Sequence, residues 1–468
     1  MVSLLETDLY QIRIAERNWI QNYNKIEVHE LFFRKAPFNG AYALAVGINE
    51  ALKFLNASLS KKECKWLIKQ NFSKEFVDYL YNACQNKSLF GKIKVYTVKE
   101  GTVVFPHEPI VKVIGPTIPV QLLETYLMYS IGYPSLIATK ASRNVYISKS
   151  KKPEVIVTEM GLRRAQTGAG HIGAKAAYIG GVDMTCDAYV GMKYGIPTSG
   201  GSMMHSDIMR RENEIDAFRS FYDYVNYKNK VIFLIDTYDL FTGCVNAIKV
   251  GKEMLKNGHY LLGVRIDSGN LIEVVPKIRK MLDDAGFTKT KIMLSGDLNE
   301  YKISEMVDSN IPFDMLGIGT ELITGGDQPA LGAAYKLTAV EEEGRFIPKI
   351  KISASSAKTT IPGSHQVYRF YSEQGQILKD IIAIDDEFID EGKPLLNLVY
   401  DRESISKDYS YSEKEVITTS RANAQKNLNS LPEEYRTLVP ARQFPVVLST
   451  KTKEARDKLT KEFEETSH

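Results

Sequence analysis

One stretch decides the fold expected for this chain: Val155-Ile156-Val157-Thr158-Glu159-Met160-Gly161-Leu162-Arg163-Arg164-Ala165-Gln166. The β-branched run at 155–157 predicts a buried strand, and α/β enzymes place their sites just past the carboxyl end of such strands. Paired arginines at that point offer forked donors to phosphates or carboxylates. Further on, His205 lies in a loop of glycines and hydroxyl residues, where a ligand can reach it. For either feature alone, surface arginines and a satisfied core histidine remain the alternative interpretation.

Short apolar runs alternate with helical patterns from residue 155 to about residue 320. The runs that predict strands lie at 155–157, 231–235, 261–264, 291–294 and 313–316. The segments that predict helices lie at 174–178, 188–194, 215–224, 244–256, 272–285 and 300–308. Each strand ends in a small, acidic or glycine residue. This order predicts an α/β fold with an irregular (β/α) barrel, whose site lies on the carboxyl-end face.

The flanking regions lack this regular alternation. Before residue 150, helices are expected at 7–24, 41–55, 61–86, 119–129 and 136–148, and strands at 27–34, 93–101 and 103–113. After residue 330, strands are expected at 334–340, 349–353, 366–370 and 377–384, and helices at 418–429 and 452–465. We therefore expect an N-terminal α/β domain over 1–130 that is completed by about 340–400. The barrel is expected over 131–339, and a helical C-terminal segment over 401–468.

Composition excludes several classes of protein. The chain has 468 residues, of which 44% are hydrophobic, as in soluble globular proteins. Its 60 basic and 57 acidic residues leave a net charge of +3, so no strong field indicates a nucleic-acid partner. The four cysteines form no CxxC pair, which fits reduced thiols in the cytoplasm. No export signal and no run of about 18 apolar residues is found, so no membrane segment is expected.

Three features at the ends of the predicted strands indicate residues that could bind a substrate or catalyse a reaction. The segments 295–297 (Ser-Gly-Asp) and 317–320 (Gly-Ile-Gly-Thr) both lead toward helices, so their backbone N–H groups are suited to cradle a phosphate. Arg265 and Asp267 are two residues apart, and in extended geometry they point the same way, as a structural pair or as ligands for a sugar or magnesium. A carboxylate commonly orients a catalytic histidine, and we expect Asp236 to do this for His205.

Taken together, these blocks resemble nicotinate phosphoribosyltransferases. The resemblance rests on segments in matching order from about residue 5 to residue 400. They are Thr7-Asp8-Leu9-Tyr10-Gln11, Phe32-Phe33-Arg34-Lys35, the Gly161–Gln166 segment, Tyr178-Ile179-Gly180-Gly181, Asp236-Thr237-Tyr238-Asp239, Arg265-Ile266-Asp267-Ser268-Gly269, Ser295-Gly296-Asp297, Gly317-Ile318-Gly319-Thr320 and Ala334-Tyr335-Lys336-Leu337.

The resemblance implies an enzyme of NAD salvage. The implied fold is the irregular barrel of type II phosphoribosyltransferases, with a split α/β sandwich domain. The implied reaction joins nicotinate to 5-phosphoribosyl pyrophosphate, with Mg²⁺, and yields nicotinate mononucleotide and pyrophosphate. ATP is the co-substrate, and its hydrolysis is coupled through phosphorylated His205. A homodimer with shared active sites is also implied, in which the N-terminal segment of one subunit completes the site of the other.

The resemblance also assigns roles to individual residues. Tyr10 and Arg163 would hold the pyridine ring, while Arg34, Arg265 and Lys336 would meet phosphates. Asp267 would hold ribose or the metal. The remaining positions implied in substrate binding are Ser206, Ser268, Gly296, Asp297, Gly317, Gly319 and Thr320.

The segments expected around the base depart from the family pattern. Met160 stands where an aromatic residue is usual, and Cys186-Asp187 where a Ser-Asn pair is usual. A carboxylate at Asp187 would accept a hydrogen bond from an amide and repel an acid, so nicotinamide is the closest rival base. The sequence also leaves open a quinolinate phosphoribosyltransferase and a non-catalytic sensor that keeps the ligand pocket.

Overall fold

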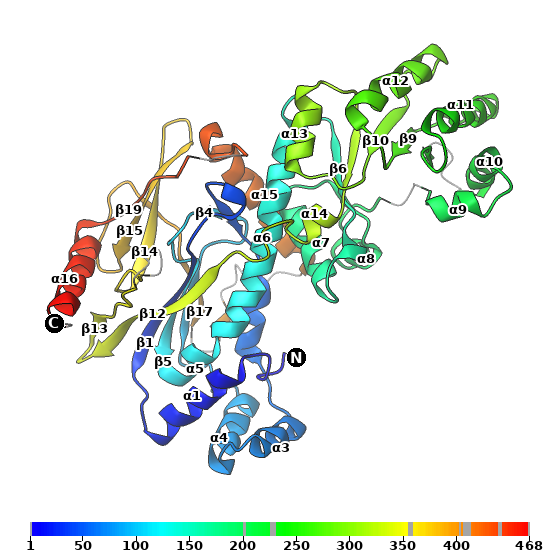
Figure 1. Ribbon diagram of the computed structural model, residues 1–468. Coiled ribbons are helices and arrows are strands. Elements are labelled where there is room, and N and C mark those ends of the chain that lie inside the picture. The colour runs from blue at the N-terminus through cyan, green and yellow to red at the C-terminus, as the bar shows by residue number, and fades with distance from the viewer. Residues whose placement is uncertain are drawn as a thin grey trace. The chain divides into compact units, whose positions relative to one another are not determined.

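The computed structural model describes residues 2–199, 203–224, 231–353, 359–401, 404–405, 413–438 and 442–466. The chain contains both helices and strands and is an α/β protein (Figure 1). It divides into two compact units, each described here by itself. Unit 1 comprises Met1–Thr139 and Ala330–His468, and unit 2 comprises Lys140–Pro329.

The main sheet of unit 1 has the strand order β13-β12-β1-β5-β3-β17-β18. Its strands are β1 (Ile26–Phe33), β3 (Lys94–Thr97), β5 (Val111–Pro116), β12 (Ala333–Glu342), β13 (Arg345–Pro348), β17 (Asn397–Asp401) and β18 (Ser404–Ile405). Neighbours are antiparallel, and β1 lies between β12 and β5, with Glu30 opposite both Lys336 and Lys112. Segments from both ends of the sequence therefore share one sheet.

Two smaller sheets complete the strands of unit 1. One has the order β16-β14-β15-β19, formed by β14 (His365–Tyr371), β15 (Ile377–Ile384), β16 (Lys393–Pro394) and β19 (Val446–Leu448). The other pairs β2 (Ala43–Ala45) with β4 (Thr102–Val104). The helices of this unit are α1 (Leu9–Ile20), α2 (Ile48–Ala51), α3 (Lys61–Lys69), α4 (Lys74–Gln85), α5 (Thr117–Leu122), α15 (Glu413–Ser430) and α16 (Thr450–Thr466).

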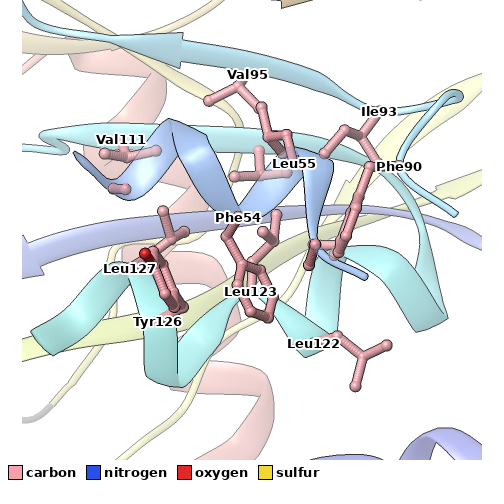
Figure 2. Packing of buried hydrophobic residues seen from close by; sticks show 14 of the residues in the cluster. Phe54, Leu55, Phe90, Ile93, Val95, Val111, Leu122, Leu123, Tyr126 and Leu127 are labelled. Atoms are coloured by element: carbon pink, nitrogen blue, oxygen red, sulfur yellow. The ribbon is translucent and has the colours of Figure 1, made fainter. Parts of the chain in front are cut away.

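Aromatic packing forms the centre of the core of unit 1 (Figure 2). Phe54 is fully buried and stacks on Tyr126 with ring centroids 4.5 Å apart and an interplanar angle of 22°. Phe90 lies 5.8 Å from Phe54 in a tilted arrangement. Figure 2 shows Leu123 and Leu127 beside these rings. Offset aromatic pairs of this kind add to the free energy gained from apolar burial.

Unit 2 is built on six parallel strands in the order β7-β6-β11-β10-β9-β8. They are β6 (Ile156–Glu159), β7 (Met184–Thr185), β8 (Ile232–Leu234), β9 (Gly263–Ile266), β10 (Lys291–Leu294) and β11 (Met315–Ile318). The helices are α7 (Ala169–Ile179), α8 (Ala188–Tyr194), α9 (His205–Met209), α10 (Glu214–Tyr224), α11 (Leu240–Lys256), α12 (Leu271–Asp284), α13 (Glu300–Asp308) and α14 (Thr320–Ile323). A further helix, α6 (Glu124–Lys149), crosses the boundary between the units.

The pattern of buried residues explains why this order folds. Helix α12 buries Val275, Ile278 and Leu282, whose spacing of three and four residues forms one apolar face. The strands β8 and β11 are buried at every position, as expected where a parallel sheet is covered on both faces. The strand–helix alternation predicted from residue 155 onward is thus confirmed in the elements β6 and β8 to β11.

The sheet of unit 2 has two edges, β7 and β8. In the residues that the structure describes, no ladder of hydrogen bonds joins these two strands, so a closed barrel is not seen there. A single parallel bridge, from Thr185 to Thr198, extends the β7 edge.

Several predicted elements differ in the structure. Of the helix expected over 41–55, residues 43–45 form the strand β2, and α2 begins only at Ile48, after Gly47, whose φ is +98°. The helix expected over 61–86 is divided into α3 and α4. The helix expected over 136–148 instead begins at Glu124, and it continues through Pro134. The strand expected over 349–353 is absent from those described residues, and β13 ends just before them.

Candidate active site

Parallel strands bring the predicted site residues of unit 2 to one edge of its sheet. Because all six strands of unit 2 run the same way, their carboxyl ends meet at that edge. One group there, the Asp267 cluster, consists of His205, Asp236, Thr237, Arg265, Asp267, Ser268 and Ser295. A second group, the Asp187 cluster, lies at the ends of β6 and β7 and consists of Glu159, Arg163, His171, Thr185, Cys186 and Asp187.

Asp267 is the centre of the first cluster. Its Oδ1 accepts a hydrogen bond from Arg265 Nη2 at 2.7 Å and another from the hydroxyl of Ser295. Arg265 Nε also donates to Ser295 Oγ, at 2.8 Å. The other carboxylate oxygen, Oδ2, lies 3.9 Å from His205 Nε2. The arginine and the serine thus hold one oxygen of Asp267 while the second faces the histidine.

These partners keep Asp267 ionised. Burial by itself would raise the pKa of this carboxyl group, because it removes water from the charged form. The hydrogen bond from Ser295 and the charge of Arg265 outweigh burial, with a smaller effect from His205, and the pKa lies below its ordinary value. An ionised carboxylate beside an arginine and a histidine therefore stands at the end of β9.

His205 is the first residue of α9, and its side chain is 44% exposed. Its Nδ1 lies 3.1 Å from the hydroxyl oxygen of Thr237. Among the described residues, the polar partners of the imidazole are Thr237 and Asp267, so the expected direct pairing of this ring with Asp236 is not found there. Sequence reasoning missed Thr237, although it directly follows Asp236. The preceding residues Gly200-Gly201-Ser202 lie outside the described residues, and Ser206 is exposed on α9.

Asp236 contacts the neighbouring strand end instead. Its Oδ2 accepts hydrogen bonds from the backbone N–H of Asp267 at 2.8 Å and from the hydroxyl of Ser268 at 2.6 Å. Its other oxygen, Oδ1, is buried and has no hydrogen-bond partner within the described part of the chain. Asp236 therefore ties the end of β8 to the end of β9, and it leaves one acceptor atom unsatisfied.

The two glycine-containing turns pack closely on neighbouring strands. Gly296 has a φ of +92°, and a Cβ there would lie 2.0 Å from the Asp267 carbonyl oxygen, so only glycine fits. Asp297, next to it, also has a positive φ, of +47°. A Cβ added at Gly317 would lie 2.6 Å from the Met160 sulfur atom. Helices α13 and α14 begin just after these turns, the latter at Thr320, one residue beyond Gly319.

In the Asp187 cluster the carboxylates are fully buried. Glu159 is 0% exposed, and its Oε2 accepts a hydrogen bond from Thr185 Oγ1 at 2.7 Å, while its Oε1 accepts one from the N–H of Gly161. Burial raises the pKa of Glu159 despite these two donors. Arg163 is exposed on the following turn, where its Nη1 donates to the Met160 carbonyl oxygen at 3.4 Å.

Asp187 is also 0% exposed, and both of its carboxylate oxygens have partners within the chain. Oδ1 accepts a hydrogen bond from the N–H of Val190 at 3.1 Å and so caps α8. Oδ2 lies 2.6 Å from His171 Nδ1. The adjacent thiol, Cys186, is neutral at ordinary pH, because burial raises its pKa to about 11. Asp187 therefore presents no surface to a ligand, contrary to the role expected from its position in the sequence.

Three of the expected site residues belong to unit 1 and are described there. Tyr10 is 53% exposed on α1, and its hydroxyl oxygen accepts a hydrogen bond from Gln11 Nε2 at 3.0 Å. Lys336 on β12 lies 3.7 Å from Glu124 Oε1. Arg34 follows β1, and its buried Nε has no hydrogen-bond partner among the described residues.

Neither a ready-made metal cluster nor a membrane helix is found in the residues that the structure describes. No group of three or more histidine, cysteine or acidic side chains has the arrangement of a metal site in this part of the chain. Among the described helices, none is long and apolar enough to cross a membrane.

Comparison with known proteins identifies the family. Residues 5–132 match the model of the nicotinate phosphoribosyltransferase (NAPRTase) N-terminal domain. Nicotinate phosphoribosyltransferase of Bacillus subtilis is 35% identical, and the match covers 95% of this chain and 92% of that protein. A Mycobacterium tuberculosis nicotinate phosphoribosyltransferase is 32% identical, with 96% and 92% covered.

A solved structure agrees with these relatives. The crystal structure of human nicotinic acid phosphoribosyltransferase matches with a TM-score of 0.81 and 26% identity, over 97% of this chain and 99% of that one. The match spans both units of the chain. By sequence and by fold, this chain belongs to the nicotinate phosphoribosyltransferase family.

Proposed function

We propose that this chain is the phosphoribosyltransferase that makes nicotinate mononucleotide in NAD salvage. In this reaction the ring nitrogen of nicotinate forms a bond to C1 of 5-phosphoribosyl pyrophosphate, and the bond from C1 to the pyrophosphate oxygen breaks. The products are nicotinate mononucleotide and pyrophosphate. The observation that carries the proposal is the Asp267 cluster, which joins an ionised carboxylate, an arginine and a histidine at one strand end.

Asp267 has the properties that the bond-breaking step needs. Positive charge builds up on the sugar as pyrophosphate departs, in the same way as in glycoside hydrolysis. A carboxylate that is already ionised and already oriented stabilises this charge without a reorganisation step. The lowered pKa of Asp267 and its two hydrogen bonds meet both conditions.

The phosphates of the sugar are assigned to the neighbouring strand ends. Arg265 offers a guanidinium group for a phosphate or for the departing pyrophosphate. Gly296, Asp297, Gly317, Gly319 and Thr320 are proposed to line the ribose-phosphate pocket, with Ser268 beside them. The close packing of Gly296 on the Asp267 backbone supports this assignment, because it brings the turn against the residue that would act on the ribose.

We assign the coupling to ATP to His205. The histidine would accept a phosphoryl group from ATP with release of ADP, and water would later take that group from the imidazole. Such a covalent intermediate divides one difficult step into two. The exposed ring and its contacts with Thr237 and Asp267 support this role, and Ser206 is proposed to bind substrate beside it.

The acidic residues present fit Mg²⁺ that is carried by the substrate. Magnesium usually binds one or two carboxylates and keeps its other sites for phosphates and water. Asp267 Oδ2 is the carboxylate oxygen that would hold it, and the unsatisfied Asp236 Oδ1 belongs to the same cluster. When bound, the ion would neutralise the charge that develops on pyrophosphate.

The remaining assignments concern the base and the assembly. Tyr10 and Arg163 are proposed to hold the pyridine ring, and Arg34 and Lys336 to meet phosphates. We further propose a homodimer in which the N-terminal segment that carries Tyr10 completes the site of the partner subunit. The exposure of Tyr10 and Leu9 on α1, at 53% and 41%, supports this arrangement.

The proposed architecture completes the assignment. We assign the chain the irregular barrel of type II phosphoribosyltransferases over 131–339, with a split sandwich domain over 1–130 and about 340–400. The C-terminal segment over 401–468 is assigned as mainly helical, although the short strand β19 lies within it. The parallel sheet of unit 2 supports the barrel, and the pairing of β1 with β12 supports the split domain.

A direct assay tests this function. The purified chain is incubated with 5-phosphoribosyl pyrophosphate, Mg²⁺ and either nicotinate or nicotinamide, with and without ATP, and the mononucleotide is measured. We expect nicotinate mononucleotide to form, faster when ATP is present, with release of ADP. Consumption of nicotinamide alone would contradict the choice of base. Tight binding of the sugar pyrophosphate without any product would indicate the sensor instead.

A further inference from the structure

We propose that His171 is a specificity-determining residue of the base site, and that its imidazole, held by the buried Asp187, binds the carboxylate of the pyridine substrate. This inference rests on the proposed function, and it deepens that function by naming the group that selects the acid. It assigns Asp187 a positioning role, since this residue acts through His171 and does not touch the substrate.

Asp187 is fully buried, with 0% of its surface exposed. One of its carboxylate oxygens caps α8, and the other accepts a hydrogen bond from the ring of His171. A buried carboxylate needs charged or strongly donating partners, because an uncompensated charge is very unfavourable away from water. Of these two partners, the backbone N–H of Val190 is neutral, and His171 is the one that can carry a positive charge.

The contact with His171 has the length of a charge-assisted hydrogen bond. The distance from Nδ1 to Asp187 Oδ2 is 2.6 Å, which is short for a hydrogen bond between a ring nitrogen and a carboxylate. With Nδ1 occupied by Asp187, Nε2 is the ring nitrogen that remains for a ligand, and in an imidazolium it donates to a carboxylate.

The imidazole of His171 is partly exposed to solvent. The residue lies in the first turn of α7, and its side chain is 46% exposed, although its partner is buried. The ring also lies 5.0 Å from the ring of Tyr189 on α8, at an angle of 47°. A buried carboxylate on one side and an aromatic ring on another fix the orientation of the imidazole.

A hydrogen-bonded network connects His171 to the residues assigned to the base. The backbone N–H of Asp187 donates to Thr185 Oγ1 at 3.0 Å, and the hydroxyl of Thr185 donates to Glu159. Glu159 in turn accepts from Gly161, two residues before Arg163. This network places His171 and Arg163 on the Asp187 cluster, at the carboxyl ends of β6 and β7.

The groups of this cluster that reach solvent are cationic or neutral. Arg163 and His171 are exposed, while both carboxylates are buried. Burial raises the pKa of the Cys186 thiol to about 11, which leaves the thiol uncharged. A carboxylate at Asp187 would disfavour an acidic base if it faced the site. Because it is buried behind His171, it favours the acid.

The test compares both bases across four variants of the full chain. KM and kcat for nicotinate, nicotinamide and 5-phosphoribosyl pyrophosphate are measured for His171→Ala, His171→Lys, Asp187→Asn and Lys193→Gln. Lys193 is an exposed cation on α8, one turn beyond Tyr189, so Lys193→Gln controls for the loss of a nearby surface charge. Thermal melting checks the fold of each variant.

We expect the loss of His171 to raise the KM for nicotinate but not the KM for nicotinamide. His171→Ala should raise the KM for nicotinate by about 10-fold or more, the size expected for one hydrogen bond to a charged group, and leave the KM for nicotinamide and the sugar pyrophosphate within about twofold. His171→Lys should restore part of the affinity, because it restores the charge. Asp187→Asn keeps a residue that can cap α8 but removes the charge that holds the ring, so it should also raise the KM for nicotinate.

Each contrary outcome is decisive. A KM for nicotinate that stays within about twofold in His171→Ala overturns the inference and leaves the proposed function intact. Equal increases in the KM for both bases in His171→Ala also overturn the inference. So does an increase of the same size in the KM for nicotinate in Lys193→Gln. If the unmodified chain makes no nicotinate mononucleotide, the proposed function fails, and the role of His171 fails with it.

Discussion

The Asp267 cluster and the Asp187 cluster lie on the same edge of one parallel sheet, yet they use carboxylates in opposite ways. Asp267 is partly exposed, pairs with Arg265 and has a pKa below its ordinary value. Glu159 and Asp187 are fully buried, and burial raises the pKa of Glu159. These differences fit the roles proposed for the two groups, in the reaction for Asp267 and in the positioning of His171 for Asp187. Burial and partners decide which role a carboxylate takes.

The largest expected effect is that of Asp267→Asn. The substitution keeps the shape of the side chain but removes the charge that stabilises the sugar in the transition state. We expect kcat/KM to fall by about 10³-fold, or about 4 kcal/mol, which is typical for the loss of one preorganised electrostatic contact. Steady-state kinetics measures the loss, and a melting temperature close to that of the unmodified protein would show that the fold is intact. A loss below about 10-fold would remove Asp267 from the reaction.

Removal of the histidine in the same cluster should have a narrower effect. His205→Ala should abolish stimulation by ATP while most of the slower, uncoupled synthesis remains, because Asp267 and Arg265 keep their contacts with Ser295. Rates with and without ATP, together with ADP release, measure this. Thr237→Val, which removes the hydroxyl next to the ring, should reduce the stimulation less. ATP stimulation that persists in His205→Ala would refute the phosphohistidine.

A substitution at Arg163 tests whether the Asp187 cluster binds the base. Arg163→Ala should raise the KM for the base by about 10-fold while the KM for the sugar pyrophosphate changes much less, since the guanidinium is assigned to the pyridine ring. Arg164→Ala, which removes the adjacent exposed arginine, is the matched control. Equal effects on both substrates would show that the Asp187 cluster does not hold the base.

The smallest expected effects concern the stability of the fold, whose dependence on pH should have opposite signs for the carboxylates of the two clusters. Folding raises the pKa of Glu159, so its contribution to stability is complete below its ordinary pKa of 4.5 and falls as the pH rises above that value. Folding lowers the pKa of Asp267, so its contribution is complete above the ordinary pKa of 3.8 and is lost as the pH falls below it.

Melting temperatures across this pH range check both signs. The advantage of the unmodified protein over Glu159→Gln should shrink as the pH rises above 4.5. Its advantage over Asp267→Asn should shrink as the pH falls below 3.8. Parallel changes in the two variants would mean that the two carboxylates share one environment, and the comparison would lose its basis.

The sequence predicts much of the Asp267 cluster, because strand periodicity and strand ends are local signals. Asp236, Arg265, Asp267 and the Ser295–Asp297 turn each follow an apolar run, and parallel pairing brings them together. The contact of Thr237 with His205 was not predictable in this way. Which of two adjacent residues reaches the ring depends on the backbone of the turn after β8, and a sequence pattern does not specify that conformation.

The Asp187 cluster was less accessible to sequence analysis. The sequence shows that a carboxylate stands at residue 187, but its burial depends on the packing of α7 and α8. Its partner, His171, lies 16 residues earlier and carries no motif of its own. Burial keeps this carboxylate from the surface, where the sequence alone had placed it against the base.

The central claim is that the carboxyl-end edge of one sheet holds the sugar at the ends of β9 to β11 and the base at the ends of β6 and β7. A crystal structure of the full chain with nicotinate, 5-phosphoribosyl pyrophosphate and Mg²⁺ tests it most directly. The account predicts the ribose against Asp267, its phosphate in the turns at Gly296 and Gly319, and the nicotinate carboxylate within hydrogen-bonding distance of His171 or Arg163. Ligands bound at the amino-end edge of the sheet, or a base bound far from the Asp187 cluster, would contradict it.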